Sequence, residues 1–377
     1  MEARKLDRVP SRVAHLPMPL DPAIGVTGLN IAPTFMFKSA LYPAVIEFTT
    51  IIHPKDSNGL PLPVVSTGIE DKDTNPNPPV PPTPIATGKT GKCRVIFKSG
   101  DDLRQDQLVM QMFSLMDSLL KDVNLDLKLL TYGILATGPA DGIMEFVSGS
   151  IAISAIMKQY NGSIGAYLKE MHPDPTEPLG ISAKCMDIYV KSCAGSCVIS
   201  YILGIGDRHL DNVMMKDSGQ LFHIDFGFIF GRDPKPYPAP FRFTRAMVDA
   251  MGGEESEHYA KFKTLCCQAY TWLRKSANLI LSLLSLMGDA GIPDMSAPLT
   301  DLPTVLAKVE ERFRLDLTGK YIYGFVCFVQ YAICTIYTIY TLYTLYYITV
   351  YIHSICKHTL YVDSTIPTIN ILYAIYH

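Results

Sequence analysis

The sequence predicts an α+β protein with two lobes, the first mainly β and the second mainly helical. Three observations support this prediction. Between residues 34 and 148, short apolar runs alternate with turn residues, which is the pattern of paired strands. From residue 151 onward, apolar residues follow helical spacing. Residues 204–231 interrupt the helices with two polar clusters. The 377 residues are enough for a two-lobed core with little to spare.

The overall composition limits the function classes. The formal net charge of -3 argues against a general nucleic-acid binder, which normally carries a basic excess. The nine cysteines form no C-x-x-C pair. Because no signal peptide is visible at the start, we expect reduced thiols in a cytoplasmic chain.

The first lobe is predicted to begin with two strands. Residues 1–33 are Pro-rich and poorly periodic, so we expect an arm or linker there. Two apolar runs, 34–43 and 44–52, then suit a strand pair. Lys38 and Ser39 lie at their junction, where a loop could close over phosphates, although these residues taken alone favour a plain hairpin turn. Residues 55–91 are rich in Pro and Gly and predict a solvated insertion.

A strand and a helix follow this insertion. Residues 93–98 read as a strand that ends in Lys98, and Asp101 and Asp102 are expected to cap a helix that runs to about Val123. Asp106 is expected to face partly inward from this helix. A lysine that leaves a strand and an acid on the next helix are typical of phosphate-binding sites. The alternative is a surface lysine with a solvated aspartate.

Two further strands are expected at 128–138 and 141–148. The second leads into Gly149 and then into helical sequence, which suits a hinge between lobes. An adenine ring needs an apolar slot and one or two backbone hydrogen bonds, which residues 144–147 could supply. The second lobe then shows helical patterns at 151–160, 164–171 and 181–203.

The segment 204–231 carries the chemistry. Its first cluster contains Asp207, Arg208, His209 and Asn212, and its second is Asp225-Phe226-Gly227. Two short apolar runs around the turn at residues 217–219 predict a β-hairpin that brings the clusters side by side. Asn and Asp offer hard oxygen ligands for Mg²⁺, and an Asp/His pair offers a base for a hydroxyl. Together these groups predict phosphoryl transfer. The alternative is a surface hairpin with polar turns.

The segment after this hairpin is predicted to be a loop. Residues 232–240 contain too much Pro for a helix or a central strand, so they form a loop placed to contact the phosphate acceptor. The cations of this region are scattered and never adjacent. They are Arg232, Lys235, Arg242 and Arg245. Helices are expected again at 254–287 and 304–317.

The tail at 318–377 differs in composition from the rest. Residues 321–356 contain no Asp, Glu, Lys or Arg, so length and lack of charge would allow a membrane span. Residues 335–346 instead repeat with a period of three, which matches neither helix nor strand. We therefore expect low-complexity sequence, with a membrane anchor as the alternative.

The motifs resemble those of the phosphatidylinositol 3-kinases, and within them the class III, vacuolar-protein-sorting type. The resemblance covers about residues 20–317. GDDLRQD and GDRHxxN would also admit phosphatidylinositol 4-kinases and the large related protein kinases, whereas FKSALYP and GRDPKPYP point to class III. The segments that carry the resemblance are FKSALYP from Phe37, IFKSGDDLRQDQLVMQM from Ile96, GDRHLDNVMM from Gly206, FHIDFGFIFGRDPKPYP from Phe222, AMVDAMGG from Ala246 and EERFRLDL from Glu310.

The resemblance implies a bilobal protein-kinase-like fold that transfers the γ-phosphate of ATP to the 3-hydroxyl of phosphatidylinositol. It implies ATP and Mg²⁺ as cofactors, with Mn²⁺ as an alternative metal. Asp207, His209 and Lys98 would be catalytic, without a decision about which of Asp207 and His209 is the base, and Asn212 and Asp225 would bind the metal. The implied nucleotide-binding residues are Lys38, Ser39, Ile96, Lys98, Asp106, Tyr132, Met144, Glu145, Val147, Met214 and Ile224, and the implied substrate-loop residues are Arg232, Lys235 and Arg242.

The scattered cations of the substrate loop suit a headgroup with a single phosphodiester charge rather than a polyphosphorylated one. The resemblance also implies a regulatory pseudokinase and a coiled-coil autophagy adaptor as partners, and peripheral binding to endosomal, vacuolar or autophagic membranes. The family's C2 and helical domains and its usual C-terminal helices have no counterpart here. The alternative function is therefore an inactive fragment that acts at most as a binding module.

Overall fold

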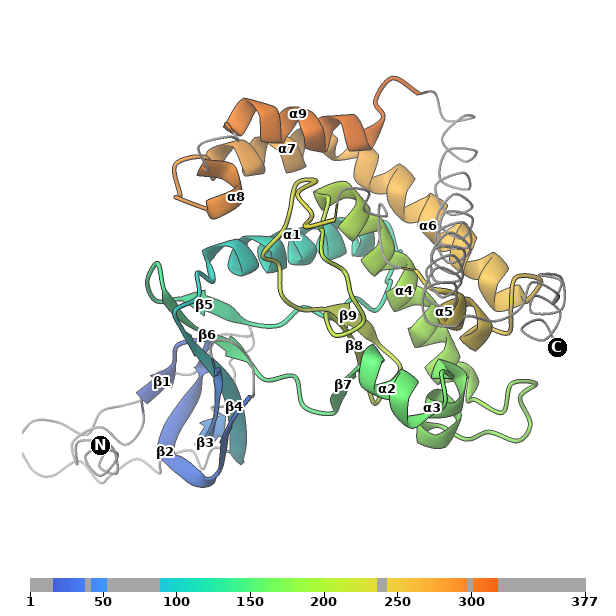
Figure 1. Ribbon diagram of the computed structural model, residues 1–377, viewed down its shortest axis with the longest axis horizontal. Helices are drawn as coiled ribbons and strands as arrows, with labels where there is room; N and C mark the ends of the chain where they lie inside the picture. Colours follow the sequence, from blue (N-terminus) through green and yellow to red (C-terminus); the bar gives the residue numbers. More distant parts are fainter. Residues whose placement is uncertain (1–15, 38–41, 53–88, 236–242, 297–300, 318–377) are drawn as a thin grey trace, which may run out of the picture. The chain divides into compact units, whose positions relative to one another are not determined.

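The computed structural model describes residues 16–37, 42–52, 89–235, 243–296 and 301–317, all within the first of two units, Met1–Tyr323. Strands come first and helices later, and most described residues from 153 to 317 are helical or in short connections (Figure 1). The predicted α+β class with a mainly β first lobe is confirmed by this order and by the family match reported below.

The first lobe is built on one antiparallel sheet. Its described strands follow the order β1-β2-β3-β4-β6-β5. They are β1 (Leu16–Met18), β2 (Asp21–Met36), β3 (Ala44–Ile52), β4 (Lys89–Ser99), β5 (Ile134–Ala136) and β6 (Asp141–Glu145).

The alternation of side chains in β3 explains its place in the sheet. Val45 and Glu47, two residues apart, are both about 1% exposed and therefore share the covered face. Glu47 is paired across the sheet with Asn30 on β2 and Arg94 on β4. It accepts a hydrogen bond from Asn30 at 2.8 Å and forms ion pairs with Arg94 at 2.7 Å and Lys92 at 3.1 Å. These cross-strand pairs fix the register of three strands.

The predicted arm over residues 1–33 is wrong from residue 16 onward, because β1 and most of β2 lie there. Pro22 and Pro33 concealed the strand signal. Pro22 lies next to the strand's start, and Pro33 lies where the register with β3 shifts between Asn30 and Phe35. Such a shift releases the proline from the hydrogen-bonded ladder.

Three other predicted boundaries differ from the structure. Lys89–Gly91, expected in the insertion, belong to β4, and the rest of the insertion, 53–88, lies outside the described residues. The strand predicted at 128–138 is present only as β5, because Lys128 adopts a positive φ of 53° and its N–H bonds to Asp126 in a turn. The helix predicted at 254–287 divides at Ser276.

Helix α1 (Arg104–Lys121) connects the sheet to the helical lobe, since it contacts both β5 and α6 (Figure 1). Its apolar stripe is buried as predicted, including Leu108, Met112 and Met116. The predicted capping is only partly right. Leu103 occupies the N-cap position, while Asp102 accepts the N–H of Arg104 at 3.1 Å.

The second lobe contains a three-stranded sheet and a set of helices. The strands follow the order β7-β8-β9 and are β7 (Ser150–Ala152), β8 (Val213–Lys216) and β9 (Leu221–His223). The helices are α2 (Ile153–Gln159), α3 (Ile164–Met171), α4 (Ala183–Leu203), α5 (Arg245–Ala250), α6 (Glu257–Lys275), α7 (Ala277–Leu286), α8 (Pro293–Ser296) and α9 (Leu302–Phe313).

Helix α4 is the central helix of this lobe. Among the described helices it alone is long and apolar enough to span a membrane, but 78% of its most apolar stretch is buried inside the protein. That burial is the property of a core helix. Helix α4 packs against α6 and β9, and its last residue leads directly into the segment 204–231. The predicted tail at 318–377 lies outside the described residues.

Candidate functional site

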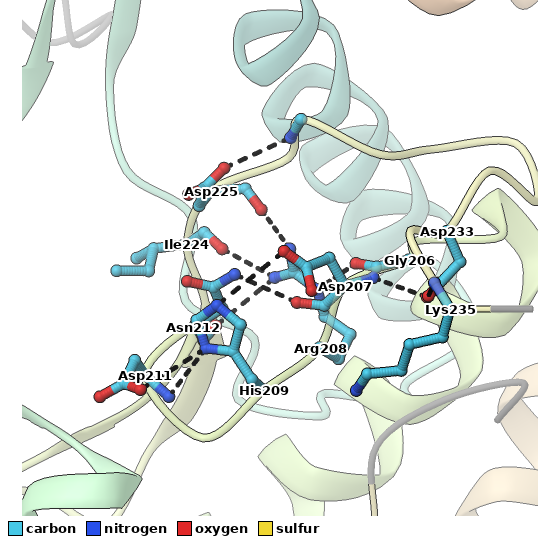
Figure 2. A network of polar contacts seen from close by, with 11 residues as sticks. Gly206, Asp207, Arg208, His209, Asp211, Asn212, Ile224, Asp225, Asp233 and Lys235 are labelled. Carbon is cyan, nitrogen blue, oxygen red and sulfur yellow. Dashed lines mark hydrogen bonds and ion pairs between the residues drawn. The ribbon is translucent and has the colours of Figure 1, made fainter. Parts of the chain in front are cut away.

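The predicted hairpin is confirmed, and it brings the two polar clusters together. Strands β8 and β9 pair antiparallel, with Val213 opposite His223. The ladder continues one step further, where the N–H of Ile224 donates to the carbonyl of Asn212 at 3.1 Å. Asn212 and Asp225 therefore flank the same end of the hairpin. Figure 2 shows their side chains with those of Asp207 and His209 in one polar network.

Arg208 holds this network together, and sequence reasoning assigned it no role. Its guanidinium donates to the carbonyls of Gly206 at 2.8 Å, Ile224 at 2.7 Å and Asn212 at 3.4 Å, and also to the carbonyl of Asp225. The group is only 6% exposed and lies over the ring of Phe226, 5.4 Å from its centroid. The planar fork of arginine suits this multiple contact. The position of Arg208 within the first polar cluster was the only feature of the sequence that could have indicated this role.

The segment after Asp225 runs beside the segment before Asp207. The N–H groups of Gly206, Phe230 and Gly231 donate to the carbonyls of Phe228, Leu203 and Gly204, each at 2.9 Å. Asp233 adds a side-chain contact, because its Oδ2 accepts the N–H of Asp207 at 2.8 Å (Figure 2). Asp233 is a second residue that sequence reasoning missed.

The two acidic residues of the clusters have unusual backbones. Asp207 and Asp225 adopt positive φ values of 49° and 60°. Non-glycine residues rarely adopt this conformation, and such residues concentrate at functional sites. Here the contacts of Arg208 and Asp233 with the neighbouring backbone hold both residues in place.

The chemistry of Asn212 and Asp225 fits a divalent cation. The Asn212 amide donates through Nδ2 to the carbonyl of Asp207 at 3.1 Å, which leaves Oδ1 as an oxygen ligand. The N–H of Gly227 donates a long hydrogen bond of 3.4 Å to Oδ1 of Asp225, and Oδ2 of Asp225 takes no part in this bond. Among the described residues, no group of three or more His, Cys, Asp or Glu side chains is placed to hold a metal. A cation here would therefore take its remaining ligands from phosphate and water, as Mg²⁺ does.

His209 lies between the carboxylates of Asp207 and Asp211. Its Nδ1 faces the backbone N–H of Asp211 at 3.3 Å, and its Nε2 lies 3.9 Å from Oδ2 of Asp207. If Nδ1 accepts the Asp211 N–H, the neutral ring carries its proton on Nε2, on the side of Asp207. The His209 side chain is 45% exposed and the Asp207 side chain 28%, so both can be reached by a substrate.

Lys98 lies near the end of β4 and forms an ion pair with a residue of the turn that follows. Its Nζ contacts Asp101 at 2.9 Å rather than Asp106. Burial lowers the pKa of Lys98, but the Asp101 contact and the charges of Asp106 and Asp225 raise it by more. The pKa therefore lies above its ordinary value, and the ammonium stays charged. The charge of Asp225 acts on Lys98 in the same direction as those of Asp101 and Asp106.

Asp106 supports the second cluster directly. It is 6% exposed, and its Oδ1 accepts the N–H of Phe226 at 3.1 Å. Burial raises its pKa to about 6, against the opposing effect of Lys98. Tyr132 supports the same cluster from another side, because its hydroxyl donates to the carbonyl of His223 at 3.2 Å. Both residues thus hold the backbone around Asp225, a role the sequence did not reveal.

The predicted adenine-binding residues lie on the sheet edge and on the hairpin. Ile96 on β4 is paired with Met144 on β6. Met214 and Ile224 are half-buried on or next to the hairpin strands. The N–H of Glu145 bonds to Gly133 at 2.7 Å and the N–H of Phe146 to Arg94 at 3.1 Å.

The hydrogen bonds of this segment leave one amide for a ligand. Within the described residues, the N–H of Val147 has no partner, while its carbonyl accepts the Ser150 hydroxyl at 2.7 Å. The Val147 amide is therefore the group of this segment that can donate to a nucleotide base.

The remaining site predictions fall on the loops. Lys38, Ser39 and Arg242 lie outside the described residues. Lys235 is exposed, and its N–H donates to Asp233 at 2.8 Å. Arg232 was expected to face substrate, but it forms an ion pair with Asp294, which is 1% exposed. That partner gives Arg232 a structural contact within the chain.

A mainly β lobe, a helical lobe and a hairpin that gathers Asp, His, Asn and Asp are the arrangement expected from the sequence for the lipid-kinase class. Residues 92–297 match the family "Phosphatidylinositol 3- and 4-kinase", and the chain belongs to this family. Its predicted resemblance to the class III phosphatidylinositol 3-kinases is confirmed by the relatives described next.

Three relatives illustrate the similarity. The chain is 46% identical over 299 residues to "Phosphatidylinositol 3-kinase, root isoform" of Glycine max, and equally identical to "Phosphatidylinositol 3-kinase VPS34" of Arabidopsis thaliana. It is 40% identical over 307 residues to "Phosphatidylinositol 3-kinase VPS34" of Saccharomyces cerevisiae. These matches cover 79–81% of this chain but only 30–32% of each relative, so the chain spans about a third of their length.

Proposed function

We propose that the chain transfers the γ-phosphate of ATP to the 3-hydroxyl of phosphatidylinositol. The observation that carries the proposal is the convergence of Asn212, Asp225, Asp207 and His209 at one end of the β8–β9 hairpin, within the electrostatic reach of Lys98. Phosphoryl transfer requires mainly positioning of the reactants and neutralisation of charge, and these residues provide both.

Each side chain has a role in this proposal. Asn212 and Asp225 would hold Mg²⁺, which neutralises the phosphate oxygens when bound. Lys98, kept charged by Asp101, would contact the phosphates of ATP. Two groups near the acceptor remain. Asp207, close to the ring of His209, would accept the proton of the inositol hydroxyl, and Nε2–H of His209 would donate to the transferred phosphate.

The nucleotide would lie between the sheet and the hairpin. Ile96 and Met144, paired on neighbouring strands, would form one side of an apolar slot, with Met214 and Ile224 on the other. The Val147 N–H, without a partner in the described part of the chain, would donate to the adenine ring. These assignments predict ATP as the phosphate donor and Mg²⁺ as the metal, with Mn²⁺ as the alternative, because amide and carboxylate oxygens are ligands for both ions.

The acceptor is proposed to be phosphatidylinositol itself. Arg232 and Lys235 are both exposed, but Arg232 forms an ion pair with Asp294, so Lys235 is the cation of the described part of the loop that has no ion pair within the described residues. One such cation suits one phosphodiester charge better than the added charges of a bisphosphate. We further propose that the protein acts peripherally on endosomal, vacuolar or autophagic membranes, with a regulatory pseudokinase and a coiled-coil adaptor as partners. The relatives' names support phosphatidylinositol 3-kinase activity and do not favour an inactive fragment.

The first prediction tests this activity. The purified full chain, with ATP and Mg²⁺, should phosphorylate phosphatidylinositol in vesicles and should leave the 4,5-bisphosphate unchanged. Asp225→Ala should lower the rate by about 10³-fold or more, because it removes a metal ligand from a site that works by charge neutralisation. The measurement is the 3-phosphorylated product, separated by chromatography.

The control is Asp289→Ala, since Asp289 is exposed and lies outside both polar clusters. It should retain most of the activity. Equal rates on phosphatidylinositol and its bisphosphate would contradict the proposed acceptor. An active Asp225→Ala variant would contradict the site.

A further inference from the structure

Asp294 is a buried carboxylate that lies far from the two polar clusters in sequence. It contacts the loop that runs from Asp225 to Lys235. It belongs to α8, and its side chain is 1% exposed. Its Oδ2 accepts the N–H of Ile229 at 3.0 Å, and its Oδ1 pairs with the guanidinium of Arg232. Ile229 and Arg232 both belong to the segment that follows Asp225.

Asp294 is also joined to the first turn of α1. The two residues Gln105 and Asp294 bind each other twice. The Gln105 amide donates to Oδ2 of Asp294 at 3.2 Å, and Gln105 Oε1 accepts the backbone N–H of Asp294 at 3.0 Å. The same Gln105 amide donates to the carbonyl of Phe226 at 2.7 Å.

These contacts form a clamp of two side chains on one loop. Gln105 holds Phe226, the residue after the metal-binding Asp225, while Asp294 holds Ile229 and Arg232. Gln105 and Asp294 are 3% and 1% exposed, so their hydrogen bonds are shielded from water. A buried charge is retained only when its partners are in place, which makes the loop geometry depend on Asp294.

We propose that Asp294 is a positioning residue that fixes the course of residues 226–235 between the metal site and the substrate-facing Lys235. It touches neither nucleotide nor lipid. Its effect on catalysis rests on the proposed function, because it acts by placing the loop that meets the acceptor. Its effect on the loop itself does not depend on that function.

Three variants separate the contacts. Asp294→Ser shortens the side chain and removes all its contacts. Asp294→Asn can keep an oxygen toward Gln105 and Ile229 but turns an amide toward Arg232. Arg232→Met removes the ion pair from the loop side, together with the contact of the guanidinium with the Phe228 ring. Asp301→Ser is the matched control, because Asp301 caps α9 by accepting the N–H of Thr304 at 3.0 Å and serine is also a good N-cap.

Hydrogen exchange on the full chain provides a readout without any substrate. In Asp294→Ser, amides in peptides covering 226–233 should exchange at least about tenfold faster, since the Ile229 N–H loses its acceptor. Peptides from α4 should keep the wild-type rate. Unchanged exchange over 226–233, or an equal rise in α4, would overturn the proposal. If Asp294→Ser does not fold, Asp294→Asn and Arg232→Met decide, and each should raise exchange around residue 232.

Kinetics then test the catalytic consequence. Asp294→Asn and Arg232→Met should lower kcat for phosphatidylinositol by about tenfold, leave the KM for ATP within about twofold, and show no further loss when combined. Equal losses in ATP hydrolysis and lipid phosphorylation would show a merely structural role. If the wild-type protein fails to phosphorylate lipid, the proposed function is wrong. The hydrogen-exchange result still tests whether Asp294 fixes the course of residues 226–235.

Discussion

At the scale of single residues, a side chain that does no chemistry organises the site. Arg208 donates to four carbonyls that lie in or next to the two polar clusters, and the single ammonium of a lysine could not replace the planar guanidinium. The acceptors are the carbonyls of Gly206, Asn212, Ile224 and Asp225. Burial lowers the pKa of Arg208, while the charges of Asp225 and Asp207 oppose that effect. The charge thus also balances the acidic residues it positions.

Asp106 gives a prediction at this scale. Asp106→Asn keeps a hydrogen-bond acceptor for Phe226 but removes the negative charge near Lys98, so lipid phosphorylation should fall by about tenfold or more. Stability should be equal or higher. Burial raises the pKa of Asp106 from 3.8 to about 6, so ionising this carboxyl costs more free energy in the folded state than in the unfolded state, and the full cost applies above pH 6.

The measurements are initial rates at saturating ATP and the urea midpoint of unfolding. The stability gain of Asp106→Asn should shrink as the pH falls through 6, where the wild-type carboxyl takes up a proton in the folded state. Asp117→Asn on the same helix is the control, because Asp117 pairs with Lys121 near the surface. A fully active Asp106→Asn variant would contradict the role.

At the scale of elements, two loops approach each other more closely than side chains allow. A Cβ added at Gly206 would lie 2.1 Å from the carbonyl oxygen of Arg232, a backbone atom that cannot swing aside. The loop after Asp225 can therefore bond to the loop before Asp207 only because position 206 lacks a side chain. The short hairpin between them sets the distance.

Gly206→Ala should consequently destabilise the protein by about 1–3 kcal/mol, the usual cost of overpacking. Lipid phosphorylation should fall as well, since Asp207 would shift. Thermal unfolding and initial rates measure the two effects. Gly138→Ala is the matched control, because a Cβ there meets nothing within 4 Å. Equal unfolding temperatures for the two variants would refute the close approach.

At the scale of the whole molecule, the described part is joined by α1. Its first turn contacts the loop after Asp225 through Gln105 and Asp106, and its Phe113 ring lies 6.2 Å from that of Phe226. Lys98 lies on β4, which is joined to α1 by a short connection. Helix α1 therefore links the strand that carries Lys98 to the loop after Asp225.

Glu47 gives a prediction about the stability of the whole molecule. Its contacts with Arg94 and Lys92 lower its pKa to about 2, against the opposing effect of burial. The sign follows from this shift. A carboxyl with a lowered folded pKa stabilises the protein above its ordinary pKa of 4.5, and this stabilisation is lost as the pH falls through 2.

Glu47→Gln should therefore be less stable than wild type at pH 7, measured by the urea midpoint. The difference should be the same at pH 8 and pH 6 and clearly smaller at pH 3. A difference that persists unchanged at pH 3 would show that the charge of Glu47 is not its source. The absence of any difference at pH 7 would contradict the cross-strand network.

Much of the fold could be predicted because its signals are local. The α1 stripe, helices α2 to α4 and the β8–β9 hairpin follow from periodicity and turn residues within one segment. Strand β2 could not be predicted, since its Pro and Gly residues oppose a strand locally and only pairing with β3 stabilises it. The break at Ser276 likewise has no strong local signal.

The sequence alone determined the candidate catalytic side chains, because Asp207, His209, Asn212 and Asp225 lie in one short segment whose hairpin is encoded locally. Only the tertiary structure decided which residues hold them. Arg208, Asp233 and Asp294 act through contacts with backbone groups, and those contacts exist only after distant segments have packed. Spacing along the chain reveals neighbours in sequence, whereas a hydrogen bond across 65 residues arises from folding.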